Sequence, residues 1–228
     1  ACLKDENKTA HVMTETALLS LHISDSFNTK ENGKNTLNHV ELIFKKDISK
    51  AIKKAEIIAK ATNDAKDLIN LPANIATPKY IVNYAKKNLK KAKITVFGKK
   101  DIIKNKFGLV EAVSRSSKVE PQFMVMEYKP QNPRNSRPYC FVGKGITFDT
   151  GGVSLKPSKW MKNMKDDMSG AASVVCMMKA LSEMNAPFHV IGITPLCENA
   201  IGGDSYKVDD IVKAHNGLNV EIINTDAE

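Results

Sequence analysis

Two carboxylates stand close together near residue 228, where Asp226 and Glu228 follow the mainly apolar run of residues 220–223. In an extended segment, side chains two residues apart point to the same side, so both carboxylates can converge on one object. A metal ion is the natural object, because carboxylate oxygens suit divalent cations such as Mn²⁺, Mg²⁺ and Zn²⁺. The spacing therefore predicts a bound cation.

Further candidate ligands lie upstream, on either side of residues 150–165. Taken alone, Asp166 or Asp167 is best explained as a helix-capping charge, worth about 1 kcal/mol. Several carboxylates in one cleft would repel one another without cations, so the whole set predicts a divalent-metal site, with ligands enough for two ions. The candidate carboxylates are Asp149, Asp167, Asp226 and Glu228.

Alternating helices and short apolar strands are expected to carry these residues. Helical spacing of apolar residues predicts one long amphipathic helix over residues 48–68, which we interpret as a connector between two domains. A loop with two prolines follows over residues 70–78, and Thr77 is the expected N-cap of the next helix. The pattern indicates an α/β fold with a mixed sheet flanked by helices on both faces. The other expected elements are helices over residues 14–22, 79–90, 101–106 and 168–184, and strands over residues 38–44, 93–97, 122–128, 138–143 and 189–195.

The segment after residue 138 has the strongest functional pattern. Residues 139–143 are expected to form a buried strand, and residues 144–156 the Gly-rich loop that leaves its carboxyl end. Ligands of α/β sheets bind at those ends, which favours a functional role for Lys144 and Asp149.

Composition sets the broad class. With 42% hydrophobic and 26% charged residues, and neither a signal segment nor a membrane-spanning apolar run, we expect a cytosolic globular protein. The four cysteines are scattered, which is typical of reduced thiols. A formal net charge of +9 is compatible with a nucleic-acid partner, but the lysines are dispersed and aromatic residues are only 6%, so that interpretation is not favoured.

Several segments resemble the leucyl aminopeptidase family, the cytosolic two-metal M17 enzymes. They are residues 142–152 (VGKGITFDTGG), 164–170 (MKDDMSG), 195–199 (PLCEN) and 224–228 (NTDAE), with a weaker likeness at 70–78. The resemblance implies that residues 69–228 are the first half of the catalytic domain and residues 48–68 the connecting helix. Residues 1–47 would then be the tail, or remnant, of a smaller α/β N-terminal domain.

The resemblance also implies roles for individual residues. Lys144, Asp149, Asp167 and Glu228 would hold one metal ion, Mn²⁺ or Zn²⁺. Asp149, Asp226 and Glu228 would hold the second, Asp226 also through its main-chain carbonyl. Lys156 would be the catalytic lysine, and Met164 would line the pocket for the first side chain of a peptide substrate. The substrate-binding set would be Lys144, Asp149, Lys156, Met164 and Asp167.

The sequence departs from the family pattern in two places. That pattern continues after the final glutamate with Gly-Arg-Leu, whose arginine helps to position a bicarbonate ion, whereas this sequence stops at Glu228. We therefore expect an internal fragment of a longer enzyme, inactive alone and hexameric when intact. Residues 108–117 are also less rich in Gly and Ala than the family pattern. The alternatives are a basic DNA-binding or scaffold relative without catalysis and, disfavoured by the motifs, a two-metal phosphoesterase.

Overall fold

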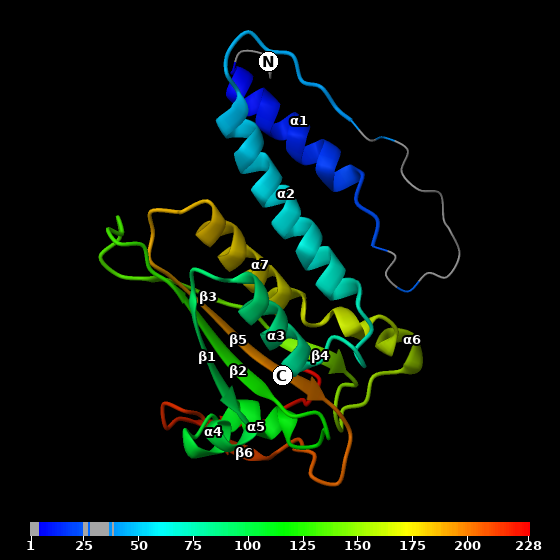
Figure 1. Cartoon of the computed structure of the whole chain (residues 1–228). Coiled ribbons are helices and arrows are strands. Elements are labelled where there is room, and N and C mark those ends of the chain that lie inside the picture. Colours follow the sequence, from blue (N-terminus) through cyan, green and yellow to red (C-terminus); the bar gives the residue numbers. More distant parts are fainter. Residues whose placement is uncertain (1–4, 25–26, 28–36, 38) are drawn as a thin grey trace.

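The computed structural model describes residues 5–24, 27, 37 and 39–228 (Figure 1). Its elements in chain order are α1 (Glu6–Ser20), α2 (Ser49–Asn70), α3 (Pro78–Asn88), β1 (Lys93–Gly98), α4 (Lys99–Lys104), α5 (Gly108–Ser114), β2 (Gln122–Tyr128), β3 (Tyr139–Val142), β4 (Gly145–Asp149), α6 (Ser158–Met161), η2 (Met164–Asp166), α7 (Ser169–Glu183), β5 (Val190–Asn199), β6 (Ile211–Lys213) and β7 (Asn219–Glu221). None of the helices in this described part is long and apolar enough to cross a membrane.

The main sheet is built around β5. One side of β5 pairs with β2, which pairs in turn with β1, and both pairings are antiparallel. The other side pairs in parallel with β3 and then with β4, so two short strands follow one long one. The predicted mixed sheet is therefore confirmed. The prediction that residues 144–156 form only a loop is wrong, because residues 145–149 continue along β5 as β4.

A break at Gly143 and Lys144 separates β3 from β4, and the start of α7 packs against it. The Ala171 N–H donates to the Lys144 carbonyl at 2.8 Å. A Cβ atom on Gly143 would lie 2.4 Å from the Gly170 carbonyl oxygen, so only glycine fits there. The small residues in this part of the sequence thus allow helix and strand to approach closely.

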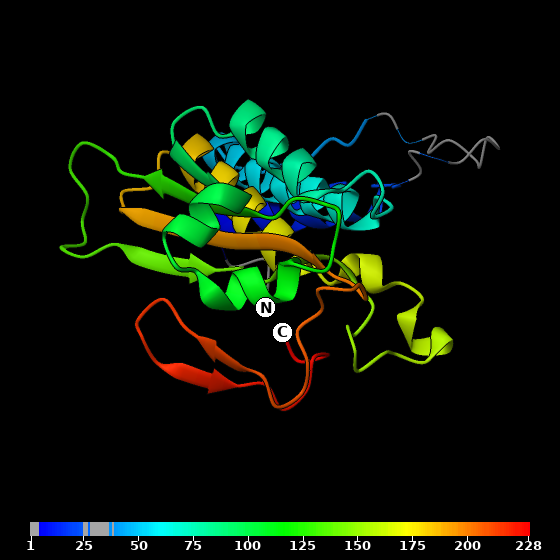
Figure 2. The same ribbon diagram turned by 90° about the horizontal axis from the view of Figure 1, so that it is seen from below.

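Helices cover the sheet unequally. On one face α7 and α3 pack directly on the strands and α2 packs on α7, while α4 and α5 lie on the opposite face (Figure 2). In β2, Met124, Met126 and Tyr128 are buried and the alternate residues are only half-buried. The densest core therefore lies between the sheet and α7.

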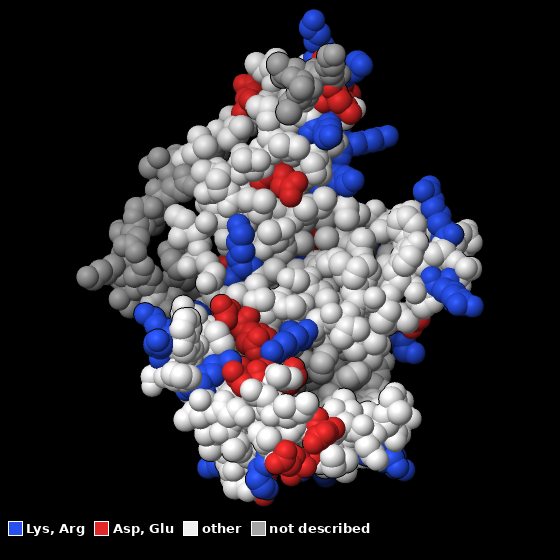
Figure 3. All heavy atoms as spheres, turned by 180° about the vertical axis from the view of Figure 1, so that it is seen from behind, with Lys and Arg blue, Asp and Glu red and all other residues white. Residues whose placement is uncertain are grey.

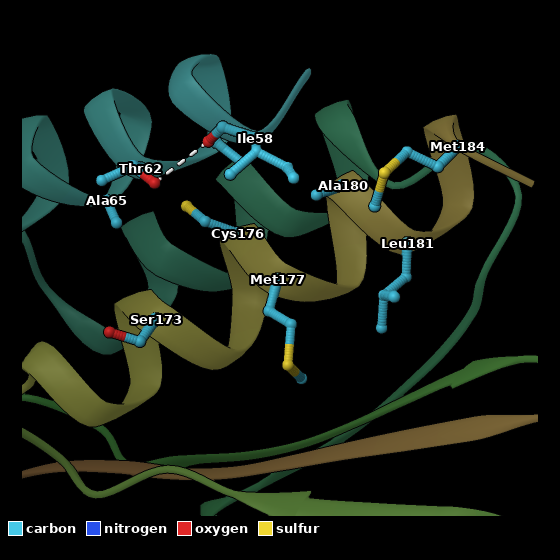
Figure 4. A pocket seen from close by; sticks show the side chains of 10 residues that line it. Ile58, Thr62, Ala65, Ser173, Cys176, Met177, Ala180, Leu181 and Met184 are labelled. Carbon is cyan, nitrogen blue, oxygen red and sulfur yellow. Dashed lines mark hydrogen bonds between the residues drawn. The ribbon is translucent and has the colours of Figure 1, made fainter. Parts of the chain in front are cut away.

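The long helix α2 contacts both α1 and α7. The Asn63 amide donates to the Leu18 carbonyl at 3.1 Å, which joins α2 to α1. On the α7 side, Lys179 forms an ion pair with Asp64. A mostly apolar cavity of about 330 Å³ lies between α2 and α7, lined among others by Ile58, Cys176 and Met184 (Figure 4). The predicted helix over residues 48–68 is thus present, two residues longer at its end.

Some local predictions are wrong. Residues 39–44 of the expected strand 38–44 are not extended in a sheet, since no described strand lies beside them to take their backbone hydrogen bonds, and Asn38 is outside the described residues. The expected helix 14–22 begins much earlier, at Glu6, where Asp5 caps it. Strand β3 is exposed rather than buried, because β5 is its only partner among the described strands. Residues 108–114, where packing was left open, form α5.

Candidate metal centre

The predicted ligands come together at the carboxyl ends of β4 and β5. Carboxylate oxygens of Asp149, Asp226 and Glu228 all lie within 4.8 Å of one another. Asp167 joins them through Lys144, whose Nζ is 3.0 Å from Asp167 Oδ2 and also contacts Glu228. We call Asp149, Asp167, Asp226 and Glu228 the carboxylate cluster.

Asp149 is a buried member of the cluster. It is the last residue of β4, and its Oδ1 accepts from the Gly151 N–H and from the Asn199 side-chain amide, both at 2.8 Å. Gly151 has φ of +85°, and a Cβ there would lie 3.0 Å from Asp226 Oδ1. Glycine therefore lets the loop turn back so that Lys156 and Asp226 meet Asp149.

Asp226 and Glu228 are held by a turn, and the expected extended segment is wrong. Residues 225 and 226 form the turn, after β7 has ended at Glu221. The fully buried Thr225 fixes it, because its hydroxyl donates to the Gly151 carbonyl at 2.7 Å and accepts from the Ser154 N–H at 2.8 Å. The carboxylates converge through this packing rather than through strand periodicity.

Two lysines lie among the carboxylates. Lys156 Nζ is 2.9 Å from Asp149 Oδ2 and also contacts Asp226, and these partners raise the pKa of Lys156 although burial opposes them. Burial likewise acts to lower the pKa of Lys144, but its contacts with Glu228 and Asp167 raise it. Both lysines are therefore ammonium ions near neutral pH.

Negative charge still exceeds positive charge in the cluster. Four carboxylates face two ammonium groups, which leaves two formal negative charges. Burial raises the pKa of Asp167 to about 6, although its contact with Lys144 acts in the opposite direction. Buried oxygens of Asp167, Asp226 and Glu228 lie at ion-pair distance from lysine but accept no well-directed hydrogen bond. Unsatisfied anionic oxygens of this kind fit divalent cations, which the residues present could hold.

Met164 and Lys165 lie on η2, directly before Asp167. Met164 is half-buried, and its expected role in a side-chain pocket stays a prediction. Lys165 donates to the Asn70 carbonyl at the end of α2, with 2.5 Å between Nζ and the oxygen. The segment that carries Asp167 is thus attached to the end of α2.

Sequence reasoning missed the residues that support the cluster from behind. Asn199 and Tyr206 both donate to the Thr225 carbonyl at 2.8 Å. The PLCEN segment pointed to residues 195–199 without suggesting a role for Asn199. No local pattern singles out Tyr206 or Thr225, because their contacts join residues distant in the sequence.

Comparison with known proteins gives the family of the chain. Residues 63–228 match the family model described as the cytosol aminopeptidase family, catalytic domain. The chain belongs to this family. A probable cytosol aminopeptidase of Paraburkholderia phymatum is 46% identical over 180 residues, which are 78% of this chain and 36% of the relative. One from Histophilus somni is 40% identical over 94% of this chain and 45% of its own length.

Solved structures share the fold of this chain. The bottromycin maturation enzyme BotP in complex with Mn superposes with a TM-score of 0.86 and 31% identity, over 99% of this chain and 48% of that one. Leucyl aminopeptidase from Trypanosoma brucei in complex with bestatin gives 0.73 and 34%, over 77% of this chain and 34% of that one. The chain thus spans less than half the length of these relatives.

Proposed function

We propose that this protein is a metal-dependent aminopeptidase that releases N-terminal residues, with a leucine-type preference, from peptides. The observation that carries the proposal is the carboxylate cluster, which retains two formal negative charges at the carboxyl edge of a sheet. Membership of the cytosol aminopeptidase family supports the reaction class.

Two divalent cations, Mn²⁺ or Zn²⁺, fit the donor set. Lys144, Asp149, Asp167 and Glu228 would hold one, while Asp149, Asp226 and Glu228 would hold the other, with the Asp226 carbonyl as a further donor. Such a pair supplies an acidified water and a polarised peptide carbonyl when bound. The presence of Mn in the BotP complex supports manganese as one candidate.

The two lysines would act differently. Lys144 can donate a lone pair to a cation only after it loses its proton. Without a cation, its ammonium group supplies positive charge to the carboxylate cluster. Lys156 is 15% exposed, and its raised pKa keeps it protonated near neutral pH. It cannot then act as a base, and we assign it to stabilising the oxyanion of the tetrahedral intermediate.

The remaining parts of the proposal concern substrate and assembly. Lys144, Asp149, Lys156, Met164 and Asp167 would contact the substrate, and bicarbonate would serve as a base in the intact enzyme. Residues 1–47 would be the remnant of an N-terminal domain and residues 48–68 its connector. A cytoplasmic homo-hexamer is proposed from the family resemblance, and the names of the relatives support the compartment.

A nucleic-acid role is not proposed. On the face in Figure 3 the basic side chains are scattered, some of them among the acidic ones, which gather in groups. No continuous basic patch on that face offers a track for a phosphate backbone.

The test is hydrolysis of leucyl amides by the intact enzyme with added Mn²⁺ or Zn²⁺. We expect turnover that Asp226→Ala abolishes, while Asp166→Ala, which removes an exposed carboxylate outside the cluster, leaves it unchanged. Activity of Asp226→Ala at the level of the wild type would refute the ligand assignment. The 228-residue chain alone is expected to be inactive, and robust turnover by it would refute that part of the proposal.

A further inference from the structure

Asn199 is a fully buried polar residue in contact with two predicted metal ligands. It is the last residue of β5, and its side chain is 0% exposed. Its Nδ2 lies 2.8 Å from Asp149 Oδ1, 2.8 Å from the Thr225 carbonyl and 3.3 Å from Glu228 Oε2. One amide therefore links the end of β4 to the turn at residues 225–226 and to Glu228.

The orientation of this amide is set by its surroundings. Its two N–H bonds serve three acceptors, so the longer contact to Glu228 is a shared one. Asn199 Oδ1 is buried and has no donor. Turning the amide over would place that oxygen against two carboxylates and a carbonyl, which is electrostatically unfavourable. The unsatisfied Oδ1 is thus tolerated in order to keep Nδ2 facing the carboxylates.

We propose that Asn199 is a positioning residue that holds Asp149 and Glu228 in place for cation binding. These are the two carboxylates expected to bridge the cations, so the inference rests on the proposed function. Donors behind metal-binding carboxylates fix their orientation, and their loss typically weakens metal affinity by about 10- to 100-fold. A donor amide does this without adding charge to a cluster that already has an excess of carboxylates.

Tyr206 offers a matched comparison. It is also buried, and its hydroxyl donates at 2.8 Å to the same Thr225 carbonyl that Asn199 contacts. Its hydroxyl donates to no carboxylate of the cluster, all four members of which are among the described residues. Tyr206→Phe therefore removes support for the turn alone, whereas Asn199→Ala removes support for the turn and for both carboxylates.

The experiment is a Mn²⁺ titration of chelator-treated protein by calorimetry, with circular dichroism to verify folding. We expect the Kd for Mn²⁺ to rise about 10- to 100-fold in Asn199→Ala and to stay near the wild-type value in Tyr206→Phe. In the intact enzyme at saturating Mn²⁺, Asn199→Ala should lower kcat more than it changes KM. Equal Kd values in Asn199→Ala and wild type, or equal losses in both variants, would overturn the inference.

A second variant covers the case in which alanine leaves too large a cavity to fold. Asn199→Asp keeps the shape of the side chain but replaces the N–H donors by an oxygen, and it should also weaken Mn²⁺ binding. Tighter binding would mean that position 199 acts as a ligand and would overturn the positioning role alone. If the wild-type protein binds no Mn²⁺, both the proposed function and this inference are refuted.

Discussion

Two groups of lysines and carboxylates in the described part of the chain differ in charge balance. Between α2 and α7, the ammonium of Lys179 is 6% exposed and pairs with Asp64, while Glu183 lies 4.0 Å away. Neither Lys179 nor Asp64 has a buried atom without a hydrogen-bond partner. The carboxylate cluster instead has four carboxylates for two lysines.

This difference separates a structural ion pair from a cation site. The Asp64–Lys179 pair lies beside an apolar cavity, where burial raises the pKa of Cys176 to about 12 and so keeps the thiol protonated. The Asp64–Lys179 pair needs no further positive charge. In the carboxylate cluster the remaining negative charge favours a bound cation. Burial of a lysine alone would not have distinguished the two groups.

The largest expected effect comes from Asp149→Asn, which keeps the shape of a bridging carboxylate and removes its charge. Loss of cation chemistry worth several kcal/mol corresponds to a fall in kcat/KM of more than about 10³-fold. Steady-state hydrolysis of a leucyl amide measures it. A fall in kcat/KM of less than tenfold in Asp149→Asn would contradict the distinction between the ion pair and the cation site.

Lys156→Met should come next, with kcat lower by about 10²- to 10³-fold, as for removal of one oxyanion-stabilising group. Mn²⁺ binding should persist, because Lys156 is not an assigned ligand. Titration calorimetry beside steady-state kinetics separates the two properties. Lys162→Met, which changes an exposed lysine, is the control and should leave kcat unchanged.

Asp64→Asn should reduce stability rather than chemistry. It leaves the buried Lys179 ammonium with only the more distant Glu183, 4.0 Å away, as its counter-ion, which costs about 3 kcal/mol of unfolding free energy. Urea denaturation measures the loss, and Mn²⁺ affinity should not change. Replacing both partners, Asp64→Leu with Lys179→Met, should recover most of the stability, whereas weaker Mn²⁺ binding in Asp64→Asn would show that the groups are coupled.

Mn²⁺ itself should give the smallest effect. At 100 times its Kd it should raise the unfolding free energy of the wild type by about 2.7 kcal/mol, and EDTA should reverse the gain. The same increment is expected in Asp64→Asn and none in Asp149→Ala, which removes a ligand assigned to both cations, as measured by urea denaturation with and without metal. A Mn²⁺ increment that survives in Asp149→Ala would place the binding site elsewhere.

Local sequence patterns predicted much of the fold. The near-continuous apolar run of β2 gave its bounds, and Thr77 was found as the cap of α3, where its side chain accepts from the Tyr80 N–H. Strand β4 was missed because glycines flank a stretch that becomes a strand only by pairing with β5, about fifty residues away. The expected strand at 38–44 had the right alternation, but alternation cannot supply a neighbouring strand.

The candidate site was predictable in part. Motifs singled out the members of the carboxylate cluster, and the structure brings them together, although their roles as ligands stay a prediction. The means of convergence was not predictable, since it depends on Thr225 being buried against Gly151 and on the Asn199 amide. These contacts join residues 26 to 74 positions apart in the chain.

The central place of β5 in the sheet has a consequence for the order of folding. Strands β1 and β2 can pair with each other, but β3 and β4 have no described partner except β5, which follows α7 in the chain. During synthesis β3 therefore has no strand to pair with until β5 is made. Its apolar residues, which include Phe141 and Val142, stay exposed for that time. Damage to β5 would leave those strand edges open to other chains, so we expect substitutions there to cause aggregation before they affect any catalytic step.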